Sequence, residues 1–352
     1  MTEYSLSICM PSKRSLDESR ASISSAINFC DSTGSELVVS DNSGSSEKSK
    51  MWNQIPLPFM KYLSNKKDEN LLWCDNWYNG MKNCSGSFIG IVSDDDILVN
   101  IEKSVLEYKD IKHEDIVGIK PIISLWNSQV GVYKQNNFNI NANTAVERIK
   151  QYHNLNKGNN TSYFTFYRSK MIRDIFKLLK YHPTQGGYTD WSIVLSCVAS
   201  GKILVDPSKQ LIYKNSNWFG DDAYIKKQIS KLYVECGLGE KGFLVASLLD
   251  ALDGFILIMR KSSNIAIDEK IEAAEHVLNT KIQQFINNFD INIHHRFSDI
   301  IKNKIDILKV ESKIDRKLDS CLEIISSLFP SLEGKYKKFY KYSTDLEWGN
   351  LL

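Results

Sequence analysis

The first half of the chain alternates short apolar segments with segments of helical spacing, and this order limits the folds that it can adopt. Residues 6–10 and 36–40 are predicted strands, and residues 16–29 between them repeat apolar side chains at helical intervals. Two neighbouring strands that are joined through a helix run parallel, because parallel partners need a crossover connection. The pattern therefore predicts an α/β fold with a Rossmann-like, mainly parallel central sheet.

The same alternation continues to about residue 200. Further strands are predicted at 87–92, 116–123 and 163–167, and further helices at 77–83, 170–179 and 189–200. Between them, residues 128–160 are rich in Asn, Gln and Gly. We expect this segment to be a long surface region near the active site, in part mobile.

The pattern of apolar residues changes after about residue 221, and no strand pattern is found beyond this point. Four helical segments are predicted there, at 221–236, 240–260, 268–289 and 297–328. We therefore expect a domain of residues 1–220, followed by an all-helical C-terminal domain of residues 221–352. The helical domain is a candidate for packing against the first, for homo-oligomerisation or for membrane association.

Charge and cysteine usage narrow the function classes. The formal net charge is only +2, which argues against a nucleic-acid partner, because such partners usually demand a basic excess. Seven cysteines occur without a C-x-x-C pair, as expected for buried thiols in a reducing compartment. Residues 1–7 lack the features of a secretory signal. A cytoplasmic location is the expectation.

Three consecutive aspartates follow the predicted strand at 87–92. Asp94 and Asp96 are two positions apart, so on an extended backbone their carboxylates point the same way and repel each other. A divalent cation is the partner that relieves this repulsion, and Mg²⁺ or Mn²⁺ is commonly held by one or two carboxylates together with phosphate oxygens. The alternative is an acidic turn that caps a helix starting at Ile97.

Two other aspartates occupy positions suited to chemistry. Asp41 ends the predicted strand at 36–40, where a carboxylate can accept hydrogen bonds from a nucleobase or a ribose; the alternative is an Asx-turn. Asp190 begins the predicted helix at 189–200 after two glycines, where it could act as a general base toward a hydroxyl. The alternative for Asp190 is capping of that helix, a role that Thr189 could share.

Four segments together resemble family 2 glycosyltransferases. In chain order, Leu6–Ser12 resembles V-S-V-I-I-P-T, Glu36–Ser43 resembles E-I-I-V-V-D-D-G-S, Gly86–Leu98 resembles G-E-Y-I-x-F-L-D-x-D-D, and Thr189–Trp191 resembles E-D-W or E-D-Y. Each motif is modest, but the ordered set is more specific. The resemblance covers residues 4 to 217. Within the family, the chain is similar to members that act in bacterial surface-polysaccharide synthesis.

The resemblance implies a GT-A fold and an inverting transfer of a sugar from a nucleotide diphosphate sugar, with a UDP-sugar favoured. The metal, Mn²⁺ or Mg²⁺, would be bound by Asp96 together with Asp94, and Asp190 would be the base. The implied nucleotide-binding residues are Pro11, Ser12, Asp41, Asn76, Asp94 and Asp95. The implied acceptor is a glycan or a lipid-linked glycan in O-antigen, capsule or similar biosynthesis.

Two departures keep other functions open. The position before Asp190 is Thr189 rather than Glu, and residues 213–217 lack the His of the family's Y-R-x-H pattern. A non-catalytic GT-A-like module that binds a nucleotide or a partner protein is therefore the second hypothesis. A nucleotidyltransferase ranks last, because residues 11–15 lack the glycines of its phosphate loop.

Residues 335–342 interleave lysines with aromatic residues. This pattern suits a membrane interface, where rings lie at headgroup level and lysines meet anionic lipids. It predicts peripheral contact at the inner face of the plasma membrane, which would help with a lipid-linked acceptor. The alternative is an exposed, partly ordered tail.

Overall fold

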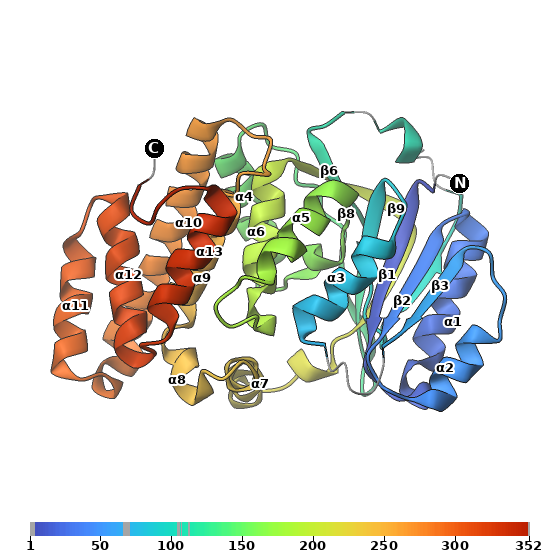
Figure 1. The fold of residues 1–352 in the computed structure, drawn as a ribbon, viewed down its shortest axis with the longest axis horizontal. Coiled ribbons are helices and arrows are strands. Elements are labelled where there is room, and N and C mark those ends of the chain that lie inside the picture. Colours follow the sequence, from blue (N-terminus) through green and yellow to red (C-terminus); the bar gives the residue numbers. More distant parts are fainter. Residues whose placement is uncertain (1–3, 66–70, 104–105, 107, 112, 351–352) are drawn as a thin grey trace. The chain divides into compact units, whose positions relative to one another are not determined.

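The computed structural model describes residues 4–65, 71–103, 106, 108–111 and 113–350 (Figure 1). The chain forms two compact units. The sheet unit comprises Met1–Asn143, Lys150–Lys177 and Gly201–Phe219, and the helical unit comprises Thr144–Ile149, Leu178–Ser200 and Gly220–Leu352. The division into domains of residues 1–220 and 221–352 stays a prediction.

The sheet unit is built on one sheet whose strands follow the order β3-β2-β1-β4-β8-β6-β9-β5, with β7 paired to β6. The strands are β1 (Leu6–Ser12), β2 (Glu36–Asp41), β3 (Met60–Ser64), β4 (Phe88–Ile91), β5 (Ile97–Asn100), β6 (Ile116–Asn127), β7 (Gly131–Asn136), β8 (Phe166–Arg168) and β9 (Lys202–Lys214). Strands β1, β2 and β4 are buried over nearly their whole length, as expected for strands covered on both faces.

The α/β class is confirmed, but the sheet is mixed rather than mainly parallel. Strand β1 pairs in parallel with β2 and β4, and β2 pairs in parallel with β3. The other half departs from the prediction because β8 lies between β4 and β6 and runs antiparallel to both. Strand β5 also runs antiparallel to β9, so a strand and not a capped helix follows the three aspartates.

Among the described residues up to 180, the α-helices are α1 (Leu16–Thr33), α2 (Ser46–Asn53), α3 (Trp73–Asn83), α4 (Ala145–Asn156) and α5 (Ser169–Leu179). Helix α1 begins with a capping box, in which Ser15 and Glu18 satisfy each other's backbone N–H groups, and it ends at Gly34 in the left-handed conformation. The polar segment 128–160 was predicted as a long surface region. It forms β7, whose Val132 and Tyr133 are exposed, and α4, whose Ala145, Ile149 and Tyr152 are buried.

The described part of residues 220–350 contains helices and no strand. Together with α6 (Asp190–Ser200), they are α7 (Asp222–Glu235), α8 (Gly239–Leu244), α9 (Ala246–Ile258), α10 (Ile267–Asn288), α11 (Asp299–Val310), α12 (Ile314–Leu328) and α13 (Leu332–Thr344). Helix α9 is almost wholly buried and packs against α6 and α10. It is the centre of the helical unit's core.

Two details of the C-terminal prediction are wrong. The segments 240–260 and 297–328 are each broken into two helices, at Val245 and between Val310 and Ile314. The exposed, partly ordered tail that was the alternative for residues 335–342 is instead part of helix α13, whose Tyr336, Phe339 and Tyr340 are fully buried.

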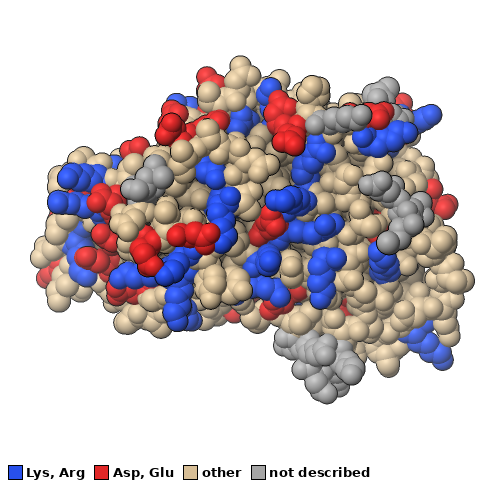
Figure 2. Space-filling view, turned by 45° about the horizontal axis from the view of Figure 1, so that its top comes forward, with Lys and Arg blue, Asp and Glu red and all other residues tan. Residues whose placement is uncertain are grey.

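The described residues include no helix long and apolar enough to cross a bilayer. Basic and acidic side chains are interspersed over the face drawn in Figure 2 rather than sorted into one basic stripe. This distribution agrees with the small formal net charge of +2.

The core of the sheet unit contains a lysine. Lys120 on β6 is fully buried and donates hydrogen bonds to Thr161 Oγ1 (3.2 Å) and Ser162 Oγ (3.4 Å). Its ammonium lies 3.7 Å from the ring centroid of Phe138, and no described carboxylate forms an ion pair with it. Burial lowers the pKa of Lys120 to about 7, since the charged form is poorly solvated there.

This burial predicts a pH-dependent stability. Between about pH 7 and pH 10 the unfolded chain keeps the proton of Lys120 and the folded chain does not, so stability rises with pH across this window. Lys120→Met should therefore raise Tm most below pH 7, by roughly 4 °C for about 2 kcal/mol, and the gain should vanish near pH 10. Thermal unfolding at pH 6.5 and 9.5 measures it. The exposed Lys50→Met control should show no such pH dependence; a pH-independent gain in Lys120→Met would contradict the prediction.

Candidate functional site

The candidate site lies where the direction of strand addition reverses. From β1 the chain adds β2 and β3 on one side, and it then adds β4 on the other side of β1. In open α/β sheets, ligands bind beyond the carboxyl ends of strands at such a switch point. The structure brings five predicted site residues to this edge: Ser12, Asp41, Asp94, Asp95 and Asp96. With Arg14 and Lys48 they form what we call the switch-point cluster.

Asp94 holds the loop that follows β1. Its carboxylate accepts hydrogen bonds from Ser12 Oγ (2.6 Å) and from the backbone N–H groups of Lys13 and Arg14 (3.0 Å each). Burial raises the pKa of Asp94, but the Ser12 hydroxyl, the Arg14 guanidinium and the backbone donors outweigh it and bring the pKa below its usual value. Asp94 is therefore ionised, and protein groups occupy its oxygens.

Arg14 places a cation in the cluster. Its guanidinium forms ion pairs with Asp94 and with Asp95 Oδ2, the latter at 2.7 Å, and its side chain is 38% exposed. The sequence analysis missed this residue, although its signal was a basic side chain two positions beyond a strand end. A half-exposed guanidinium at a switch point is suited to an anion such as a diphosphate.

Asp96 has the most unusual environment of the three aspartates. It is fully buried, and its Oδ1 accepts a hydrogen bond from the backbone N–H of Lys214 (2.9 Å). Its Oδ2 is buried and lacks a hydrogen-bond partner within the described structure. Burial, followed by the charge of Asp95, raises the pKa of Asp96 to about 8. An unpartnered buried oxygen costs free energy that a cation ligand would offset.

These carboxylates fit a divalent cation in part. Asp96 offers the free oxygen, whereas the oxygens of Asp94 already accept protein donors. Among the described residues, no three His, Cys, Asp or Glu side chains converge as a metal-binding group. The arrangement suits an ion such as Mg²⁺, which one or two carboxylates hold while ligand oxygens complete the shell. The assignment of the metal to Asp96 and Asp94 stays a prediction.

Asp41 forms a buried ion pair. Lys48 Nζ lies 3.3 Å from Asp41 Oδ1 and also donates to Ser12 Oγ, so it links Asp41 to the loop that Asp94 holds. The Asp41 carboxylate further accepts from Tyr62 OH (2.6 Å) and from the Ser43 backbone N–H (3.1 Å). The Asx-turn alternative therefore describes the local geometry, and contact of Asp41 with a nucleobase stays a prediction.

The remaining predicted nucleotide-binding residues lie nearby in the sheet unit. Pro11 belongs to the end of β1, and Asn76 on α3 accepts hydrogen bonds from Ser40 Oγ (2.8 Å) and Asn65 Nδ2 (3.4 Å). A cavity of about 340 Å³ opens at the starts of α1 and α2. It is lined by Lys13, Ser15, Leu16, Asp17, Ser43, Ser45 and Glu47. Its volume is within the usual range for small-ligand pockets.

Asp190 belongs to the helical unit, where it is the first residue of α6. It is half-buried, and its Oδ1 accepts a hydrogen bond from the backbone N–H of Trp191 (2.8 Å). Thr189 donates to the carbonyl of Gly186 (3.0 Å) within the turn that precedes the helix. The position suits both a general base and a first-turn acid that complements the helix dipole.

No protein-family model matches the chain, and no curated protein matches it. Among solved structures, it is similar to S. aureus TarS 1–349, with 12% identity over 95% of this chain and 82% of that chain and a TM-score of 0.48. The same protein in complex with UDP-GlcNAc gives a TM-score of 0.47 at 12% identity over 95% and 83%, and S. aureus TarS gives 0.48 at 13% over 96% and 55%.

Proposed function

We propose that the chain is a metal-dependent glycosyltransferase with a GT-A domain. It moves a sugar from a nucleotide diphosphate sugar, with a UDP-sugar favoured, to a hydroxyl of a glycan or lipid-linked glycan in bacterial surface glycan biosynthesis. The switch-point cluster carries this proposal, because it combines a half-exposed guanidinium with a buried carboxylate that has a free oxygen. Three of the four segments that resemble family 2 glycosyltransferases contain β1, β2 and β4, the strands whose carboxyl ends lie at this cluster.

Within this proposal, the cluster binds the donor. Asp41, Asn76, Pro11 and Ser12 contact the nucleoside, and Asp94 and Asp95 lie near the ribose and the diphosphate. Asp96 and Asp94 are the residues that would hold Mn²⁺ or Mg²⁺, whose chemistry is to neutralise the diphosphate as it departs. Arg14 adds a second positive charge toward that diphosphate.

Asp190 is proposed as the general base. The acceptor oxygen attacks the anomeric carbon from the face opposite the nucleotide, so the configuration of that carbon inverts. Asp190 accepts the proton of the acceptor hydroxyl as the new C–O bond forms and the bond to the diphosphate breaks. The nucleotide diphosphate leaves with the electron pair of the broken bond.

The second candidate is a non-catalytic GT-A-like module that binds a nucleotide or a partner. It is favoured by Asp41, whose carboxylate is satisfied by protein donors, and by Thr189 where the family has an acid. A sugar-nucleotide hydrolysis assay with Mn²⁺ separates the two. Turnover that Asp96→Ala abolishes would exclude a pure binding module, whereas absence of turnover with every UDP-sugar and acceptor tested would favour it.

Arg14→Gln tests the proposed anion contact. Loss of the guanidinium should weaken UDP binding by about ten- to a hundredfold, since a charge-assisted hydrogen bond contributes roughly 1.5–3 kcal/mol. Titration calorimetry with UDP and Mn²⁺ measures it. The matched control is Arg20→Gln on the exposed side of α1, which should bind UDP as the unaltered protein does. Equal affinity in Arg14→Gln and Arg20→Gln would dismiss Arg14 as a diphosphate ligand.

Membrane contact through residues 335–342 also stays a proposal, in a reduced form. Three of its four aromatic rings, those of Tyr336, Phe339 and Tyr340, are buried in the helical unit, so they are not available to a bilayer. Tyr342 and the lysines remain exposed. A cytoplasmic position at the inner face of the plasma membrane and homo-oligomerisation are likewise proposals.

A further inference from the structure

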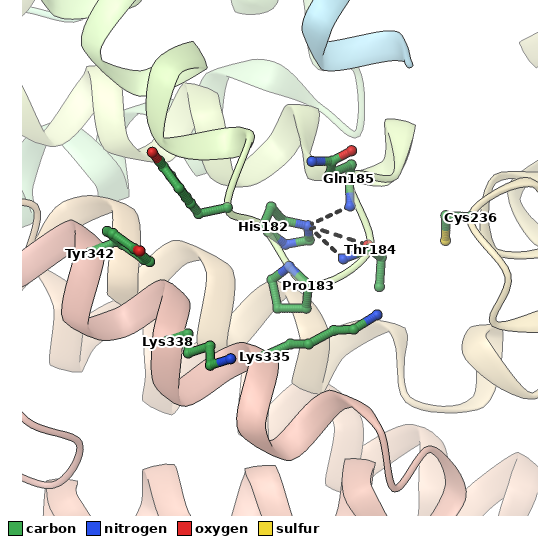
Figure 3. Close-up of a pocket in the computed structure, with 9 residues that line it drawn as sticks. His182, Pro183, Thr184, Gln185, Cys236, Lys335, Lys338 and Tyr342 are labelled. Atoms are coloured by element: carbon green, nitrogen blue, oxygen red, sulfur yellow. Dashed lines mark hydrogen bonds between the residues drawn. The ribbon is translucent and has the colours of Figure 1, made fainter. Parts of the chain in front are cut away.

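The helical unit contains a cavity that the proposed donor site does not use. Its volume is about 440 Å³, which is within the range of small-ligand pockets. One wall is the loop between α5 and α6, and another is helix α13 (Figure 3). The lining residues are Tyr181, His182, Pro183, Thr184, Gln185, Cys236, Lys335, Lys338 and Tyr342. None of them is acidic.

The cationic side chains in this cavity differ from others on the same helix. On α13, Lys337 pairs with Glu333 (2.6 Å) and Lys341 pairs with Glu347, and neither lysine lines the cavity. Lys335 and Lys338 do line it, and neither forms an ion pair or a hydrogen bond with any residue that the structure describes. Lysines three positions apart on a helix are neighbours, so the like charges of Lys335 and Lys338 repel each other, and an anion bound beside both would relieve the repulsion.

The loop between α5 and α6, which forms the wall opposite α13, is held in place by hydrogen bonds to the buried His182. His182 Nδ1 accepts hydrogen bonds from the backbone N–H groups of Thr184 (3.3 Å) and Gln185 (3.0 Å), so this nitrogen carries no proton (Figure 3). Nε2 therefore carries the proton and donates to Asp253 (2.9 Å), which also accepts from Tyr336 OH (3.0 Å). His182, Asp253 and Tyr336 are all fully buried or nearly so. The imidazole is thus neutral, and it fixes the loop without adding a charge to the cavity.

The rim of the cavity offers an aromatic surface. Tyr181 and Tyr342 stack with ring centroids 4.2 Å apart and an interplanar angle of 17°, and both are about half exposed. Exposed faces of such rings pack against the apolar C–H faces of sugars. Cationic side chains on one wall of the cavity, next to exposed aromatic rings, match a ligand with an anionic group attached to a sugar or polyol.

We propose that this cavity binds a phosphate group of a phosphate-bearing glycan acceptor, with Lys335 and Lys338 as its anion ligands. The identification of the ligand as an acceptor rests on the proposed function. An acceptor must reach the residue that activates its hydroxyl. The cavity wall is connected to that residue along the chain: Thr184 Oγ1 lies 2.8 Å from Tyr188 OH, and Tyr188 belongs to the turn Gly187–Thr189 that leads directly into Asp190.

The test uses the full chain and glucose 6-phosphate as the probe, with glucose as its uncharged control. Titration calorimetry should detect binding of glucose 6-phosphate and none of glucose. The variant Lys335→Ala/Lys338→Ala should weaken that binding about tenfold or more, because it removes two charge-assisted contacts. The matched control Lys337→Ala, on the same helix but outside the cavity, should keep the affinity of the unaltered chain. Equal weakening by both variants would overturn the proposal, as would no weakening by either.

Two further measurements separate the sources of failure. UDP binding with Mn²⁺ should be unchanged in the double variant. If the unaltered chain binds glucose 6-phosphate but does not bind UDP, the proposed function is refuted and the anion site is still supported. Vesicles with phosphatidylglycerol distinguish a lipid phosphate from a soluble one. Lysine-dependent binding of glucose 6-phosphate without vesicle binding supports a glycan phosphate, whereas lysine-dependent vesicle binding without glucose 6-phosphate binding would contradict it.

Discussion

Asp190→Asn is expected to lower sugar transfer by about 10²-fold or more while donor binding stays intact. The amide has almost the same shape as the carboxylate, but it cannot accept the proton of the acceptor hydroxyl. Asn loses only the interaction of the first-turn carboxylate with the helix dipole, about 0.3–1 kcal/mol, so helix α6 should persist. Initial rates with a UDP-sugar and acceptor, together with UDP titrations, measure the two effects separately.

A first-turn aspartate elsewhere in the helical unit provides the control. Asp222 lies in the first turn of α7, so Asp222→Asn removes the same type of helix-dipole interaction without touching the proposed base. It should leave transfer within about twofold of the unaltered chain, since such interactions contribute only about 0.3–1 kcal/mol. Normal turnover in Asp190→Asn would dismiss Asp190 as the base, and equal losses in both variants would assign its effect to helix stability.

Asp96→Asn is expected to abolish the part of UDP binding that depends on Mn²⁺, a loss of about 10²-fold or more in affinity. The substitution removes the negative charge that a divalent cation requires and keeps an oxygen for the backbone N–H of Lys214. Since burial raises the pKa of Asp96 to about 8, the fold already favours a neutral side chain there, and the variant should fold. Titrations of UDP with and without Mn²⁺ measure the loss.

Asp115→Asn is the control for that experiment. Asp115 pairs with Lys202 in the same unit and is about half exposed, so its loss should leave the Mn²⁺ dependence unchanged. If Asp96→Asn binds UDP with the same Mn²⁺ dependence as Asp115→Asn, the metal role of Asp96 is wrong. Reduced Tm in Asp96→Asn without loss of Mn²⁺-dependent binding would assign the residue to packing alone.

The spacing of apolar residues along the chain predicted those strands and helices whose formation depends on neighbouring residues. Strands β1, β2 and β4 and helix α1 follow from apolar periodicity, and the capping pair Ser15 and Glu18 marks the helix start. Helix α13 was missed although its signal was present: Tyr336, Phe339, Tyr340 and Ser343 repeat at helical spacing and are buried. The interleaved lysines hid this face, because the pattern was taken for a surface one.

Long-range pairing could not be predicted from the chain alone. The antiparallel insertion of β8 pairs it with β4, about eighty positions earlier, and with β6, about fifty positions earlier, and nothing local in Phe166–Arg168 specifies either pairing. The candidate site shows the same limit. The aspartates at strand ends were predicted from the sequence, but their partners Arg14 and Lys48 were not, because an ion pair depends on which loops the finished sheet brings together.

The most direct test is an anomalous-diffraction measurement on crystals grown with UDP and Mn²⁺. The account predicts a manganese peak at coordinating distance from an oxygen of Asp96, with the Arg14 guanidinium against the bound diphosphate. UDP bound at another place in the chain, or bound at the carboxyl ends of β1 and β4 with no manganese near Asp96, would contradict it.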